Sequence, residues 1–230
     1  MNFLQICQMV ARESGTISGT QPTTTQNQSG RLLKIVNWVA DAWTQIQNKH
    51  ASWKFMRQPF PASAATIANV QLYPAATLAI TDFGEWIVEK NLLSVYDPTI
   101  GTADETVLLF LDWDQYRRFY VQGAQTPDRP QFYSVSPSDQ LALGPIPDKV
   151  YTIRGEYRQT AQALQLDTDI PSCPARFHGT IAWKALLRLD QADEATPDAL
   201  AGAQVHYDED MSALERDQLP RFKAFVEPLA

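Results

Sequence analysis

The sequence predicts an α+β protein, in which a helical bundle formed by N- and C-terminal helices carries an inserted small antiparallel β domain and an extended C-terminal arm. Three observations predict this class. Apolar residues recur at helical spacing in 1–57 and again in 171–219, whereas short alternating segments broken by Pro, Ser and Asp fill 58–170. A Leu-Pro step then opens the arm, 220–230.

The N-terminal part is expected to contain two helices. Phe3, Ile6 and Val10 form one apolar stripe that ends near Glu13, and the stretch 14–30, rich in Thr, Ser and Gln, is expected to be a loop. A second helix is predicted from about 29 to 48, with this apolar stripe: Leu32, Ile35, Val36, Val39, Trp43 and Ile46. Trp38 lies off the stripe, which indicates a second packing surface.

The middle part has the pattern of short strands separated by turns. Strands are expected at 66–73, 86–88, 92–96, 133–135, 141–143 and 151–157. Tyr151, Ile153 and Tyr157 are expected to share one face of a single strand. The exception is 112–121, where aromatic residues at helical spacing follow Asp112, a candidate helix cap.

The C-terminal part is predicted to be helical again. Pro174 suits the first position of a helix over 175–189, which is apolar in nearly every direction except for a strip with Lys184 and Arg188. Such a helix is either central to its domain or packed against another subunit; Trp183 and Leu187, with Trp38, are therefore candidate inter-subunit residues. A last helix begins near 196–198, with this apolar stripe: Leu200, Ala203, Tyr207, Met211 and Leu214.

Composition narrows the functional classes. The chain has 230 residues, 44% of them hydrophobic, which is enough for a core and excludes a disordered chain. Its 19 Lys and Arg against 26 Asp and Glu give a net charge of −7, so a broad basic face that grips nucleic acid is disfavoured. The N-terminus lacks a signal-peptide pattern and no apolar run is long enough to span a bilayer, so a soluble intracellular product that contacts no membrane is expected.

Catalytic motifs are missing from the sequence. His50, His178 and His206 stand alone, and Cys7 and Cys173 are expected to be reduced thiols rather than a metal-binding pair. The acidic groups are better explained as a helix cap at 112–114, a solvated face at 208–210 and a loop at 167–169 that lacks the glycine and glutamate of a calcium site. We therefore expect no enzyme, no cofactor and no metal.

The order of the motifs resembles a known family. The amphipathic helix with Trp43, the segment 53–56, the segment 129–133 and the turn 145–148, which feeds a strand with Tyr151, occur in an order similar to that of the head-to-tail adaptor proteins of tailed bacteriophages. The resemblance covers nearly the whole chain. The Pro-Ile-Pro-Asp turn is its strongest element.

The resemblance implies a structural role. Members of the family form a ring, usually of twelve copies, beneath the portal, so the expected partners are the portal protein, neighbouring copies and a tail or nozzle protein. Genomic DNA is expected to pass through the channel without specific binding, and the protein is expected in the virion neck after synthesis in the host cytoplasm. The C-terminal arm is expected to reach into the portal with these residues: Arg221, Phe222, Lys223, Phe225, Val226 and Leu229.

Two other interpretations stay open at the level of the sequence. Another connector component, such as a stopper or a tail terminator, also forms a ring but does not share the long C-terminal helices and the arm. A host-surface binding or hydrolase domain requires an open aromatic or carboxylate cleft in the β region, around Trp86, Trp113 and Tyr116. The positions of these aromatic side chains distinguish the host-surface interpretation from the connector interpretations.

Overall fold

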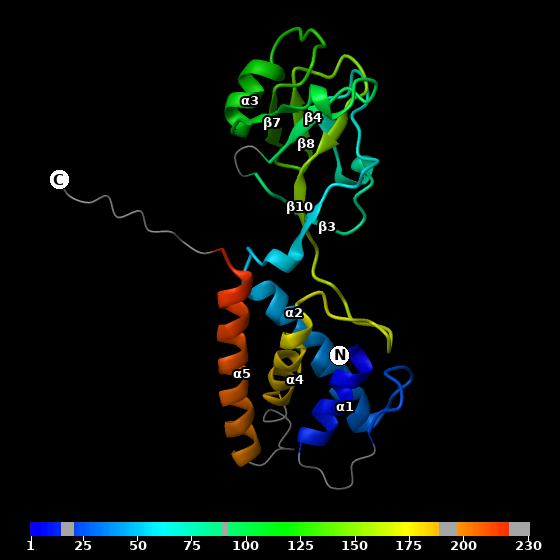
Figure 1. Cartoon of the computed structure of the whole chain (residues 1–230), viewed down its shortest axis with the longest axis vertical. Helices are drawn as coiled ribbons and strands as arrows, with labels where there is room; N and C mark the ends of the chain where they lie inside the picture. Colours follow the sequence, from blue (N-terminus) through cyan, green and yellow to red (C-terminus); the bar gives the residue numbers. More distant parts are fainter. Residues whose placement is uncertain (15–20, 89–91, 189–196, 221–230) are drawn as a thin grey trace, which may run out of the picture. The chain divides into compact units, whose positions relative to one another are not determined.

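The computed structural model describes residues 1–14, 21–88, 92–188 and 197–220. The chain divides into two compact units, a helical unit of residues 1–56 and 161–230 and a β unit of residues 57–160, and each is described by itself. Helices and small sheets are both present (Figure 1), so the predicted α+β class is confirmed.

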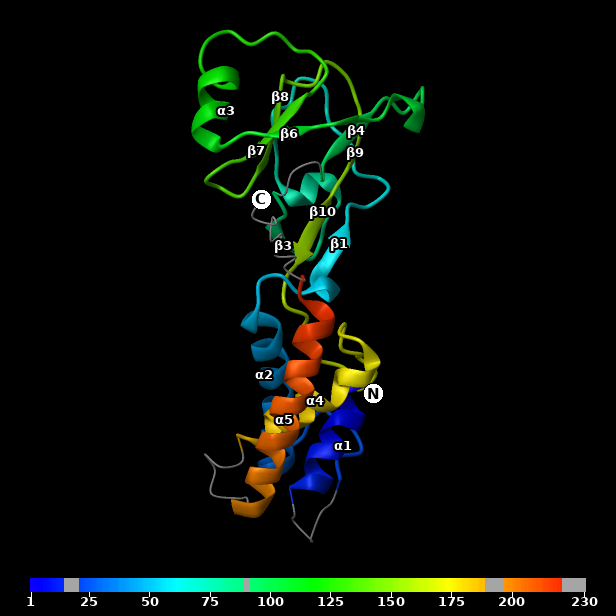
Figure 2. The same cartoon turned by 60° about the vertical axis from the view of Figure 1, so that its left-hand side comes forward.

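The helical unit is organised around one short helix. It contains α1 (Phe3–Glu13), α2 (Gly30–Lys49), α4 (His178–Leu186) and α5 (Pro197–Gln218), with 3-10 turns at Lys54–Met56 and Ala175–Phe177. Helix α4 packs against α1, α2 and α5, whereas α5 packs mainly on α4 and the 3-10 turn before it (Figure 2). A large part of α5 is therefore left at the edge of the unit.

Local sequence explains where α1 begins. Asn2 Oδ1 accepts a hydrogen bond from the Gln5 amide at 2.9 Å, and Gln5 Oε1 accepts one from the Asn2 amide at 2.9 Å. This reciprocal capping box satisfies two amide groups that the first turn of a helix leaves without partners. The predicted stripe is buried: Phe3, Ile6, Cys7 and Val10 all lie in the core of the helical unit.

The stripes predicted for α2 and α5 pack into the same core. Ile35, Val39, Trp43 and Ile46 of α2 are almost completely buried. On α5, Ala203, Tyr207, Met211 and Leu214 are buried. The helix after Pro174 is shorter than the predicted 175–189, because the chain first forms a 3-10 turn and α4 then ends at Leu186, where the Arg188 amide bonds the Ala185 carbonyl in a tightened turn.

Residues 161–170 belong to the helical unit, not to the β-rich region in which the sequence analysis placed them. Leu164 is buried in the helical core. Gln47 of α2 donates from Nε2 to the Gln162 carbonyl at 3.0 Å and accepts from the Gln162 amide at 2.8 Å. Leu164 and Gln47 thus help to attach this segment to the helices, and neither leaves a periodic pattern in the sequence.

The β unit contains three small sheets. Their strands are β1 (Arg57–Pro59), β2 (Leu72–Tyr73), β3 (Phe83–Trp86), β4 (Ser94–Tyr96), β5 (Thr106–Val107), β6 (Leu109–Phe110), β7 (Phe132–Val135), β8 (Leu141–Gly144), β9 (Thr152–Arg154) and β10 (Glu156–Gln159). The sheet orders are β1-β10-β3, β2-β8-β7-β6 and β5-β4-β9. The pairs are antiparallel except β6 with β7, which is parallel.

Three of the predicted strands are wrong in extent. The strand predicted at 86–88 shares only Trp86 with β3. Only Leu72 and Tyr73 of the segment 66–73 are in a strand, because the Tyr73 hydroxyl bonds the Ile67 and Val70 carbonyls and folds the preceding residues into a compact loop. The predicted strand 151–157 is divided at Gly155 into β9 and β10, which join different sheets. A Cβ on Gly155 would lie 2.1 Å from Cδ2 of the buried Leu93, which would have to move, so glycine is favoured at this division.

The predicted helix in the middle part is confirmed as α3 (Trp113–Tyr120). Its Tyr116 is buried and donates a hydrogen bond from its hydroxyl to the Leu143 carbonyl at 2.7 Å. Tyr120 lies against Gly144, where an added Cβ would be 2.7 Å from the ring. Asp112 occupies the N-cap position, but its side chain makes no capping hydrogen bond.

Candidate functional site

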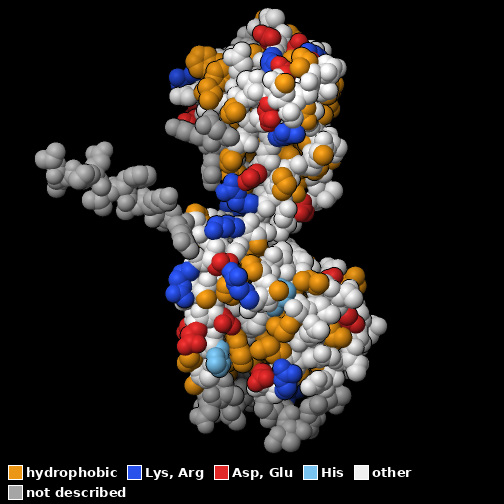
Figure 3. Space-filling model, in the orientation of Figure 1, with side chains coloured by type: hydrophobic (Ala, Val, Ile, Leu, Met, Phe, Trp, Pro, Cys, Tyr) orange, Lys and Arg blue, Asp and Glu red, His pale blue; other side chains and the backbone are white. Residues whose placement is uncertain are grey.

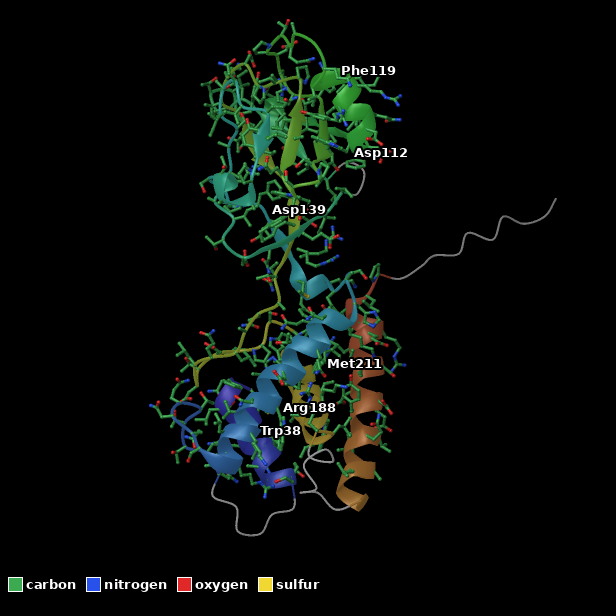
Figure 4. The ribbon with its side chains drawn as sticks, turned by 180° about the vertical axis from the view of Figure 1, so that it is seen from behind. Trp38, Asp112, Phe119, Asp139, Arg188 and Met211 are labelled. Atoms are coloured by element: carbon green, nitrogen blue, oxygen red, sulfur yellow. The ribbon has the colours of Figure 1, made fainter. Side chains whose placement is uncertain are left out.

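The residues expected to pack between subunits lie at the border of the helical core. Trp38 on α2, Trp183 on α4 and Leu187 just after α4 are each half-buried and pack against that core. Arg188 donates to Asp41 at 3.1 Å, which joins the end of α4 to α2 one turn beyond Trp38 (Figure 4). The six residues expected to bind the portal, from Arg221 to Leu229, lie outside the described residues.

Helix α4 and the turn after it present a partly exposed face at the border of the core, which we call the α4 outer face. This face comprises four half-buried residues, Trp183, Lys184, Leu187 and Arg188. Figure 3 shows hydrophobic side chains gathered on the helical unit over α4 and beside α5. The α4 outer face therefore combines two apolar groups, one of them a tryptophan, a residue type enriched at protein–protein contacts, with two cations.

Neighbouring side chains hold the cations and the tryptophan of this face. The Trp183 ring stacks on His206 of α5 with centroids 4.8 Å apart, and Lys184 Nζ lies 4.9 Å from the centroid of the Tyr207 ring. Beside them is an open groove of about 520 Å³, lined by Gln45, Asn48, Lys49, Lys184 and Tyr207. The face is thus shaped by α2 and α5 as well as by α4.

An ionic cluster joins the C-terminal parts of α2 and α5. Glu215 Oε1 lies 2.9 Å from Lys49 Nζ and 2.8 Å from His50 Nε2. Partial burial raises the pKa of Glu215, but the hydrogen bonds from Lys49 and His50 outweigh burial and leave that pKa below its usual value. The cluster joins α5 to α2.

The loop 162–172 is a second candidate surface. Asp169 Oδ2 accepts from the amides of Gln165 and Leu166, at 2.7 and 2.8 Å. The Asp169 carbonyl accepts from the Phe3 amide at 2.8 Å. The sequence pattern of 167–169 indicated only an incomplete calcium loop. It gave no sign that Leu166 and Ile170 are exposed.

The histidines and cysteines have structural surroundings. His50 contacts Trp53 edge-on, while His178 is buried and its Nε2 lies 3.1 Å from the Cys173 carbonyl. Burial raises the pKa of the Cys7 and Cys173 thiols to about 12. Within the described ranges, no group of three His, Cys, Asp or Glu residues is arranged to hold a metal ion.

In the described part of the β unit, Trp86, Trp113 and Tyr116 do not line an open cleft. Trp86 and Tyr116 are buried, and Trp113 stacks on Tyr116 with ring centroids 5.6 Å apart. The aromatic side chain that α3 does expose is Phe119, which is 66% exposed. These positions remove the structural basis for the host-surface interpretation, which required the first three residues together.

A comparison with protein families decides the identity. A family model described as SU10 adaptor protein matches residues 1–226. The chain belongs to this family. It is thus a structural phage adaptor and a virion component, and membership implies interaction with portal and tail components. A search of curated proteins found no match. Across the described part of this adaptor, no helix is both long and apolar enough to cross a membrane.

Proposed function

We propose that the adaptor forms a ring beneath the portal, joins the phage head to the tail and continues the DNA channel. The observation that carries the proposal is the family match over residues 1–226. The half-buried Trp38, Trp183 and Leu187 support it, because apolar groups at the border of a core gain further burial when a neighbouring copy covers them. Twelve copies in the virion neck is the proposed arrangement, and the role is structural rather than enzymatic.

The C-terminal arm is the proposed contact with the portal. Phe222, Phe225, Val226 and Leu229 supply apolar groups that fit clefts between portal subunits, and Arg221 and Lys223 complement acidic groups there. The opposite end of the ring meets a tail or nozzle protein. The free energy gained in the portal contact has to exceed the free-energy cost of ordering the arm.

The net charge of −7 suits a channel wall. A basic wall binds phosphate with salt-dependent affinity and retards DNA, whereas an acidic or neutral wall lets it pass. We therefore place net negative or neutral groups on the lumen. A ring structure whose lumen is lined by Lys and Arg contradicts this part of the proposal.

Mixing the full chain with purified portal rings tests the function. We expect electron microscopy to show rings on the portal, and expect a chain truncated after Leu219 to lose them. Rings that survive truncation move the portal contact to the helical unit. A full-length chain that stays monomeric beside the portal, at concentrations well above those in an infected cell, contradicts the proposed function.

A further inference from the structure

The loop 162–172 exposes two aliphatic side chains. Leu166 is 59% exposed and Ile170 is 61% exposed, and these are the largest exposed fractions among the large apolar residues of the helical unit that the structure describes. Single exposed aliphatics are common; here two lie on one short loop, and we call this pair the loop patch.

Hydrogen bonds hold the backbone on both sides of this patch. The Asp169 carboxylate binds the Gln165 and Leu166 amides, and Gln162 Nε2 donates to the Ile170 carbonyl at 2.9 Å. The Ser172 amide donates to Gln162 Oε1 at 2.9 Å. A patch fixed in this way loses little conformational entropy on binding, which favours a contact surface over a solvated loop.

The α4 outer face matches the loop in chemistry. The loop carries Asp167 and Asp169 beside its aliphatic side chains, whereas the α4 outer face carries Lys184 and Arg188 beside Trp183 and Leu187. Figure 1 shows the loop on the opposite flank of α4 from α5. The loop is therefore acidic and apolar, whereas the α4 outer face is apolar with two cations, of which Arg188 also pairs with Asp41.

We propose that Leu166 and Ile170 of one copy dock on Trp183 and Leu187 of the next copy, with the loop carboxylates facing Lys184 and Arg188. The proposal rests on the proposed ring and names the surfaces that build it. Because the two surfaces differ and lie on different flanks, the contact is head-to-tail, and repetition of such a contact closes a ring when the rotation allows. A second copy is the partner because the chain carries both complementary surfaces itself.

The first test replaces the two exposed aliphatic side chains of the loop. Leu166→Ser with Ile170→Ser removes the aliphatic groups at exposed positions, so the fold is retained. Ile67→Ser with Ile100→Ser is the matched control, since both residues are exposed aliphatics of the β unit. We expect the loop variant to need about tenfold more protein, or more, to decorate portal rings, and the control to behave as wild type.

Disulfide trapping tests the pairing directly. Each variant is assembled on the portal and oxidised, and the disulfide-linked species are then separated under denaturing conditions. We expect no covalent dimer from Ile170→Cys alone or from Leu187→Cys alone, and a covalent dimer from their mixture. The double variant should give a ladder of covalent multimers. Cys7 and Cys173 are buried and do not compete. A dimer from Ile170→Cys alone indicates loop-to-loop contact and overturns the proposal.

The outcomes separate this inference from the proposed function. If wild type fails to decorate the portal, the proposed function falls and the inference with it. If wild type forms rings while the loop variant forms them equally well and no mixed disulfide appears, the ring stands and the assigned surfaces are wrong.

Discussion

The Asp167 carboxylate binds Thr25, a residue 142 positions earlier in the chain. Asp167 Oδ1 accepts from the Thr25 amide at 2.6 Å and from its hydroxyl at 2.5 Å. Thr25 lies in the polar stretch 14–30, which is predicted from composition to be a loop. Two hydrogen bonds to one charged oxygen hold the described part of that stretch against the loop 162–172.

Asp167→Asn is expected to lower the melting temperature and to flatten its dependence on acidic pH. The hydrogen bonds from Thr25 hold the pKa of Asp167 below 3.8, so their stabilisation is fully present above pH 3.8 and is lost as pH falls through the lower folded-state pKa. Thermal unfolding between pH 2 and 6 measures this effect. Asp112→Asn, which removes a carboxylate that makes no capping hydrogen bond, is the control. Equal acid sensitivity in wild type and Asp167→Asn contradicts the assignment.

Gly144→Ala is expected to destabilise the β unit by about 1–3 kcal/mol. The new Cβ would lie 2.7 Å from Cγ of Tyr120, so the clash is relieved only by a different χ1 rotamer of Tyr120 or by a shift of α3. Chemical denaturation monitored by fluorescence gives the change. Combining Gly144→Ala with Tyr120→Ala should cost less than the sum of the two single changes; strict additivity shows that the ring is not the obstacle.

Gly202→Ala is expected to have the opposite effect, stabilising the chain by about 0.5–1 kcal/mol. Gly202 lies inside α5, and an added Cβ there would have no atom within 4 Å. Alanine therefore gains helix propensity without a clash. The same denaturation measurement applies, and a loss of stability would reveal a contact that the helical unit does not show.

Glu215→Gln is expected to destabilise the helical unit by about 0.5 kcal/mol after allowance for solvent screening. The change removes the charge that faces Lys49 and His50. Raising the salt concentration should shrink the difference between variant and wild type. Glu209→Gln, on the exposed side of the same helix, controls for the change in net charge and should have a smaller effect.

Cys7 and Cys173 are expected to resist alkylation in the native chain at pH 8. Both thiols are buried, and burial raises their pKa to about 12, so little reactive thiolate forms. Mass spectrometry after brief iodoacetamide treatment should show no adduct, and the same treatment in denaturant should label both residues. Rapid native labelling of either cysteine places it at an accessible position.

The sequence by itself determined the helices whose apolar stripes are regular. The stripe of α1, that of α2 and the stripe from Ala203 to Leu214 follow the helical period because each helix buries one face in a common core. The sequence also determined α3 and the β7–β8 pair, where turn residues separate two short apolar runs. The order of motifs was enough to indicate the adaptor family, which the family comparison then showed.

Tertiary structure alone decided the features that depend on single long-range contacts. Gln47 and Leu164 attach residues 161–170 to the helices, and Gly155 divides one apparent strand between two sheets. Each of these features depends on one residue rather than on a repeated spacing, so the periodicity of the sequence does not predict it. The loop that exposes Leu166 and Ile170 belongs to the same class: its side chains look like an ordinary apolar pair in sequence, and only the hydrogen bonds that fix its backbone keep them facing solvent.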